Sequence, residues 1–315
     1  MNMIKKVCLS GFVFTVILPL ISCSSTPDKP DGIYDTRNRA AEYLTYGWKH
    51  YNQGFYSKAE DFFLQALESN LLVDNISGVI KSYIALMQNS IAQGKKNAAE
   101  DYLARAEEWL SLTEEADVTF EYRAAKGQLL TYQGKYEEAK KILLAALSSY
   151  PDAEKKLPLK TSMVFNTLAM IEKNTGNYEK ALEYANTSIE IDKKEKNFTG
   201  LASSYYIIAA VYSRKGDIAE AIENLNISLD NDKKAENSPG IANTLLALGS
   251  LYYKQEDKET AYIYYKRSLM IYLQLENNLL ISKALERCIN TAEEIDRKKE
   301  LSWLINLREK YPTSE

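Results

Sequence analysis

The chain contains 315 residues, of which 45% are hydrophobic and 26% are charged, and its formal net charge is −4 at pH 7. This acidic balance favours neither nucleic acid nor an anionic bilayer as an electrostatic partner, so we expect no nucleic-acid binding. His50 is the only histidine, which excludes a histidine-based catalytic triad and a multi-histidine metal site.

The N-terminal segment has the features of a secretion signal. Two lysines precede an apolar run over residues 7–21, and the sequence Leu-Ile-Ser-Cys ends at Cys23. The run is shorter than the roughly 20 residues that span a bilayer, and Pro19 interrupts it, so an uncleaved membrane anchor is the weaker interpretation. The pattern resembles a bacterial lipoprotein signal, which implies removal of residues 1–22 and acylation of Cys23.

The residues that follow, 23–35, are short, polar and contain proline, and we interpret them as a lipidated tether. Each buried methylene of an acyl chain contributes about 0.8 kcal/mol, so two or more chains would hold the protein at a membrane without crossing it. Under enterobacterial sorting rules, Ser24 favours the periplasmic face of the outer membrane. Loss of residues 1–22 removes two lysines and no acidic residue, which makes the net charge −6.

One turn position recurs through the rest of the chain. It is occupied by Gly54, Gly94, Gly134, Gly176, Gly216 and Glu256, at intervals of 40, 40, 42, 40 and 40 residues. A fixed period of this kind indicates a solenoid built from one repeated unit, in contrast to separate globular domains.

Small residues flank this turn at matching distances, as Gly47, Ala59 and Ala66 do in the first unit. Small side chains at facing positions let two helices approach to about 8–10 Å, so each unit is predicted to be a helical hairpin. The turn glycine suits the left-handed residue that ends the first helix, and Glu256 should be modestly strained there.

The units resemble the tetratricopeptide repeat, whose pattern asks for a small residue and tyrosine, then Gly-x-Tyr-x-x-Ala, then Ala-Leu. Good matches are Gly-Lys-Tyr-Glu-Glu-Ala at 134–139 and Gly-Asn-Tyr-Glu-Lys-Ala at 176–181. The spacing of 40 in place of the usual 34 is similar to the longer-helix variety of kinesin light chains and peptide-sensing bacterial regulators. The resemblance covers roughly residues 36–311. It implies an all-α fold: a right-handed α-solenoid of about six helical hairpins plus a C-terminal capping helix pair.

We divide residues 36–311 into units of about 40–79, 80–119, 120–161, 162–201, 202–241 and 242–281, followed by a cap at 282–311. The last unit is degenerate, and a terminal unit needs a polar outer face to keep the stack soluble. The two extra residues of the longer interval fall near Pro151 and Pro158. Proline cannot continue a helix, so this stretch is either a longer turn or a hinge.

Cysteine usage predicts no disulfide in the mature chain. Cys8 lies in the expected signal, Cys23 is the expected lipidation site, and Cys288 stands alone. Cys288 falls at the position held by Ile208 and Leu248 in earlier units. We therefore expect it to be a buried small hydrophobe and not a reactive thiol.

The resemblance implies an inner groove lined by residues of the first helix of each unit. The candidate partner-binding residues are Trp48, Asn52, Gln128, Tyr132, Asn166, Met170, Lys173, Asn174, Tyr206, Ser213, Arg214, Asn243, Ser250, Tyr253 and Lys254. Lys173, Arg214 and Lys254 would form a basic strip able to receive carboxylates, and Asn166 and Asn243 could bind a peptide backbone. The alternative is that all of these are solvated polar faces. The carboxylate clamp of the family's chaperone-binding members is not reproduced.

These features predict a non-catalytic adaptor or assembly factor, anchored through Cys23, that binds a protein or peptide partner in the bacterial cell envelope. The alternative is a ligand-binding accessory component of an envelope transport system, in which the groove holds a small ligand. No Walker loop, Gly-x-Gly-x-x-Gly, Gly-x-Ser-x-Gly or Cys-x-x-Cys occurs, so we expect no catalytic residue, cofactor or metal. A glycosidase-like pair of carboxylates stays open, because pairing in space is invisible in the sequence.

Overall fold

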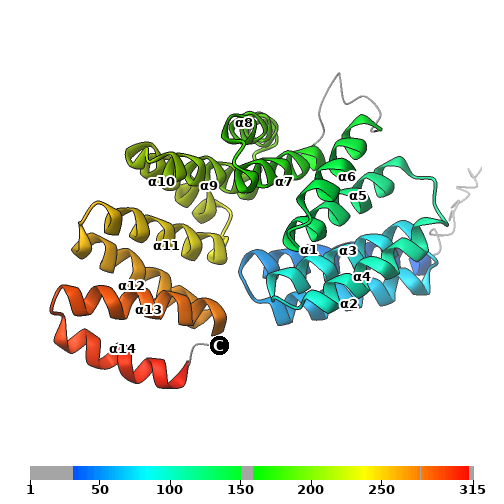
Figure 1. The fold of residues 1–315 in the computed structure, drawn as a ribbon. Coiled ribbons are helices and arrows are strands. Elements are labelled where there is room, and N and C mark those ends of the chain that lie inside the picture. The colour runs from blue at the N-terminus through cyan, green and yellow to red at the C-terminus, as the bar shows by residue number, and fades with distance from the viewer. Residues whose placement is uncertain (1–30, 150–158, 277, 312–315) are drawn as a thin grey trace, which may run out of the picture.

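The computed structural model describes residues 31–149, 159–276 and 278–311, and these ranges contain fourteen α-helices and no strand. Successive helices pair as hairpins, which stack in chain order along a curved array from the blue first pair to the red last pair (Figure 1). The pairs are α1 (Asp31–Asn52) and α2 (Tyr56–Leu72), α3 (Ile76–Ala92) and α4 (Lys96–Leu110), α5 (Ala116–Tyr132) and α6 (Tyr136–Ser148), α7 (Leu159–Thr175) and α8 (Tyr178–Glu195), α9 (Phe198–Lys215) and α10 (Ile218–Lys234), α11 (Ser238–Lys254) and α12 (Lys258–Gln274), and α13 (Asn278–Glu294) and α14 (Lys298–Lys310). The predicted all-α solenoid is confirmed.

The turn inside each hairpin is left-handed, as the sequence predicts. The φ angles are 83° at Gly54, 72° at Gly94, 77° at Gly134, 87° at Gly176 and 92° at Gly216. Glu256 takes the same conformation with φ 63°. A residue with a Cβ is strained there by about 1–2 kcal/mol, which the packing on either side of the turn must offset.

The two helices of a hairpin approach closely where glycine faces a large side chain. A Cβ added to Gly47 would lie 2.3 Å from Phe63 Cε1, and one added to Gly249 would lie 2.6 Å from Tyr265 Cδ1. Phe63 is fully buried and Tyr265 is 1% exposed. At these two positions the absence of a side chain therefore makes room for the large residue of the second helix.

A second repeated structure joins one unit to the next. Asn197 Nδ2 donates to Asp192 Oδ1 at 2.7 Å, and the Asn197 side chain accepts from the Gly200 amide at 3.2 Å. A Cβ on Gly200 would lie 2.2 Å from Asp192 Oδ2, so only glycine fits there. The same three residue types recur as Asp232, Asn237 and Gly240, with distances of 2.7 and 3.1 Å. We call each set an Asp–Asn–Gly clasp.

Two expectations, for the tether and for Cys288, concern residues near the ends of the described chain. α1 begins at Asp31, so residues 31–35 of the expected tether are helical; the last proline before them is Pro30, and nothing after it prevents helix extension. Cys288 is fully buried on α13, as expected. Burial raises the pKa of its thiol to about 12. The expected signal, Cys23 and the possible hinge at 150–158 lie outside the described residues.

The curvature brings the first hairpin against later ones. Gly54 is buried, and a Cβ there would lie 2.9 Å from both Leu275 Cδ2 and Pro239 Cγ. Gln53 Nε2 also donates to Glu236 Oε2 at 3.4 Å. The four other turn glycines are exposed and have no atom within 4 Å of such a Cβ. The turn between α1 and α2 therefore contacts the α10–α11 turn and the end of α12, which closes the superhelix on itself (Figure 1).

Candidate binding pocket

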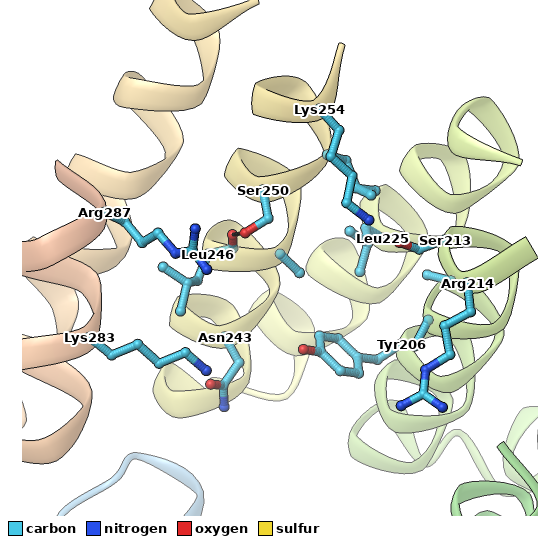
Figure 2. Close-up of a pocket in the computed structure, with 14 residues that line it drawn as sticks. Tyr206, Ser213, Arg214, Leu225, Asn243, Leu246, Ser250, Lys254, Lys283 and Arg287 are labelled. Carbon is cyan, nitrogen blue, oxygen red and sulfur yellow. Dashed lines mark hydrogen bonds between the residues drawn. The ribbon is translucent and has the colours of Figure 1, made fainter. Parts of the chain in front are cut away.

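Residues of α9, α11 and α13 line a concave pocket of about 330 Å³. This volume is within the usual range for ligand-binding pockets. Small side chains, Ala209, Ala210 and Ala247, leave room in it, while Leu246 and Leu251 form part of its apolar floor. Polar and basic side chains from the three helices surround this floor (Figure 2).

The structure brings six of the candidate residues together here. They are Tyr206, Ser213, Arg214, Asn243, Ser250 and Lys254. On α9 and on α11 the pocket-lining residues recur at intervals of three or four positions, which places them on one face of each helix. The residues that repeat register selected on these two helices therefore lie on the side that faces the pocket.

Hydrogen bonds fix several of these side chains. Asn243 Oδ1 accepts from Tyr272 Oη at 2.7 Å, which leaves the Asn243 amide nitrogen without a bond to any described residue. Ser250 Oγ donates to the Leu246 carbonyl at 3.0 Å and accepts from Tyr265 Oη at 3.3 Å. The Asn243 amide is thus oriented, and it can donate to a ligand.

The lining itself carries positive charge and contains no carboxylate. Arg214, Lys254, Lys283 and Arg287 line the pocket and no acidic residue does. None of the four forms an ion pair with a residue in the ranges that the structure describes. Arg214 Nη1 instead donates to the Lys173 carbonyl at 2.8 Å. Burial first, and then the Arg214 guanidinium, lower the pKa of Lys173 from its ordinary value.

Two candidates pack within the array and do not line this pocket. Asn166 is only 9% exposed and its Oδ1 accepts from Ser204 Oγ at 2.7 Å, so it joins α7 to α9. The Trp48 ring lies 4.9 Å from the Phe63 ring and 5.2 Å from the Tyr51 ring, measured between centroids. It packs against the hydrophobic cluster of the first units. Register gives the face of a helix, but it does not reveal which side chains the neighbouring unit covers.

The other candidates lie on first helices outside this pocket. Gln128 accepts from Gln88 Nε2 at 2.5 Å, and Asn174 Nδ2 donates to Tyr136 Oη at 3.3 Å, so both bridge neighbouring units. Tyr132 and Met170 are 43% and 36% exposed, and Asn52 is half-buried. Tyr253 lines an adjoining pocket of about 250 Å³ beside Arg287, where its hydroxyl donates to Glu294 Oε1 at 2.6 Å.

Sequence reasoning missed Lys283 and Arg287, because α13 was taken only as part of a cap. A usable signal existed. Lys283 and Arg287 follow Asn243 and Ala247 by 40 residues, and both of these earlier positions line the pocket. Extending the 40-residue register by one more unit would have found them.

No group of three or more histidine, cysteine, aspartate or glutamate residues in the described ranges could hold a metal ion. The His50 ring stacks on the Phe62 ring at 5.3 Å with an interplanar angle of 5°. None of the described helices is long and apolar enough to cross a bilayer.

Fold and pocket together define an α-solenoid with a concave, basic surface. Its family follows from sequence comparison: models described as tetratricopeptide repeat match residues 120–152 and, in two overlapping placements, residues 160–234 and 200–274. Residues 120–152 and 160–274 of this chain are therefore tetratricopeptide repeats. No curated protein matches it.

Several solved structures share the fold. A Rap protein complexed with Competence and Sporulation Factor has a TM-score of 0.61 at 13% identity, over 86% of this chain and 75% of that one. NprR in complex with its cognate peptide NprX has a TM-score of 0.55 at 18% identity, over 86% and 76% of the two chains. BtubC from P. vanneervenii has a TM-score of 0.51 at 16% identity, over 79% and 93%. At these identities the likeness shows the fold alone.

Proposed function

We propose that this protein is a lipid-anchored adaptor that binds a protein or peptide partner in the bacterial cell envelope. The observation that carries the proposal is the pocket between α9, α11 and α13, which gathers six residues that repeat register had selected. A solenoid offers an extended concave surface of this kind to its partners. The Rap and NprR structures, each solved with a bound factor or peptide, support a peptide-like occupant.

The anchor in this proposal is Cys23, held at the periplasmic face of the outer membrane. Its support is the sequence of the first 23 residues, with their lysines, short apolar run and Leu-Ile-Ser-Cys ending. Growth with an alkyne fatty acid should label the wild-type protein, and Cys23→Ala should lose both the label and membrane association. A mature protein without fatty acid would contradict the anchor while leaving the pocket untouched.

The pocket is tested by reversing two of its charges. In cells, chemical crosslinking should capture a defined partner with the wild-type protein, and Arg214→Glu with Lys254→Glu should lower this capture at least roughly tenfold. The reason is that two attractive contacts become repulsive, each exposed pair contributing about 0.2–1 kcal/mol. Both residues are exposed, so circular dichroism should show unchanged helicity.

The matched control reverses two exposed cations on second helices, Lys141 on α6 and Lys193 on α8. Lys141→Glu with Lys193→Glu changes net charge by the same amount and should leave capture intact. Equal loss in both variants, or no loss in either, would reject the pocket. A discrete oligomer that retains a small molecule in native mass spectrometry would favour the transport-component alternative.

A further inference from the structure

We propose that the last hairpin, α13–α14, is part of the recognition site, and that the partner segment it helps to bind is an acidic peptide. This inference rests on the proposed function and names the partner's chemistry. The family models end at residue 274, so α13 and α14 lie beyond the matched repeats. A purely capping hairpin needs only a polar outer face.

The inward-facing side of α13 is basic. Lys283 and Arg287 extend from α13 toward Asn243 and Ser250 on α11 (Figure 2). They lie across the pocket from Arg214 on α9. These two side chains therefore contribute to the concave surface and not to the solvent-facing end of the stack.

The surrounding carboxylates do not neutralise this cluster. Glu293 and Glu294 line an adjoining pocket together with Arg287. Glu294 is already bound to Lys258 Nζ at 3.1 Å and to Tyr253 Oη at 2.6 Å. Four cations in one concavity repel one another, in a chain whose net charge is −4. An anionic ligand would relieve this repulsion.

The spread of the cations selects an extended peptide over a single small anion. Packed helices lie about 8–10 Å apart, so three successive first helices span roughly 20 Å. One carboxylate cannot reach all of them. In an extended chain, alternate residues lie about 7 Å apart on one side, so a segment of about six residues can place several carboxylates along the pocket. The Asn243 amide nitrogen, which forms no hydrogen bond with a described residue, can donate to the backbone of such a segment.

The test uses the full-length protein in detergent and two fluorescein-labelled hexapeptides, Glu-Ser-Glu-Ser-Glu-Ser and Gln-Ser-Gln-Ser-Gln-Ser. Fluorescence anisotropy at about 20 mM salt should show at least roughly tenfold tighter binding of the acidic peptide. The preference should shrink at about 0.5 M salt, because exposed charges are then screened over about 3–5 Å. Lys283→Gln with Arg287→Gln should weaken the acidic peptide about tenfold and leave the neutral one unchanged.

A matched control lies on the same hairpin. Lys298→Gln with Lys299→Gln removes the same charge from two exposed residues of α14 that do not line the pocket, and binding should stay within about twofold of wild type. Equal effects of the two double variants would show a net-charge effect and overturn the inference. Equal or undetectable binding of the two peptides would overturn it too.

The experiments distinguish a failure of the proposed function from a failure of the inference about α13–α14. If capture in cells depends on Arg214 and Lys254 but is unchanged by Lys283→Gln with Arg287→Gln, the adaptor proposal stands and this inference is wrong. If capture is insensitive to Arg214 and Lys254 as well, the pocket itself is wrong.

Discussion

At the residue scale, buried polar side chains form hydrogen bonds in the turns that join one hairpin to the next. In the clasp between the fifth and sixth hairpins, Asp232 is 3% exposed and accepts from Asn237 and from Thr244 Oγ1, the latter at 3.3 Å. Burial nevertheless dominates and raises the pKa of Asp232 to about 6 from its ordinary value of 3.8. The pKa of Asp192, in the preceding clasp, is raised for the same reason.

The raised pKa of Asp232 predicts a pH-dependent stability. A carboxyl whose folded pKa lies above its unfolded value stabilises the fold fully below about pH 3.8, and that contribution is lost as pH rises to about 6. A shift of this size corresponds to about 2–3 kcal/mol. Asp232→Asn should therefore flatten the pH dependence of the urea midpoint between pH 4 and 6, and should not lower the midpoint at pH 7.

Asparagine is a reasonable replacement because Asn70 stands at the equivalent position in the turn that joins the first hairpin to the second. Asn75 Nδ2 donates to Asn70 Oδ1 at 2.6 Å, and Asn70 Nδ2 donates to Ser82 Oγ at 3.2 Å. Asp230→Asn is the control, because the Asp230 side chain is 70% exposed. If Asp232→Asn keeps the wild-type pH dependence, Asp232 is not the titrating group.

At the scale of the helical element, repeat register predicted that each unit forms a pair of helices, and six of the residues that it selected line one pocket. Spacing alone identified the turns, since Gly54 to Gly216 and Glu256 all have positive φ. The clasp was visible as a duplicated Asp, Asn and Gly pattern, but its role was not. Its hydrogen bonds lie within the turn that joins one unit to the next, and spacing alone does not show which side chains bond there.

The site could be predicted only in part, for the same reason. Asn166 and Tyr206 stand at the same position relative to their turn glycines, yet Ser204 binds the first and the second lines the pocket. Whether a residue at this position is bonded or lines the pocket depends on the side chain that the next unit places beside it. Lys283 and Arg287 were missed because a degenerate repeat signal was taken to mean a purely structural hairpin.

At the scale of the whole molecule, the closed superhelix limits how a partner can enter. The α1–α2 turn rests against Pro239 and Leu275, close to the end of the helices that line the pocket. Blue ribbon of the first hairpin is visible just below Asn243 and Lys283 in the close-up (Figure 2). A partner therefore meets a concavity bounded on that side by the protein itself, which suits a narrow peptide segment better than a folded domain.

The central claim is that a partner occupies the pocket between α9, α11 and α13. The most direct test places a photo-crosslinking amino acid at the exposed Asn243 position, with the exposed Leu144 position on the second helix α6 as control. Irradiation in cells should give a discrete protein adduct at Asn243 and none at Leu144, and Arg214→Glu with Lys254→Glu should reduce the adduct about tenfold. An adduct that is equal at both positions, or no adduct at Asn243, would contradict the account.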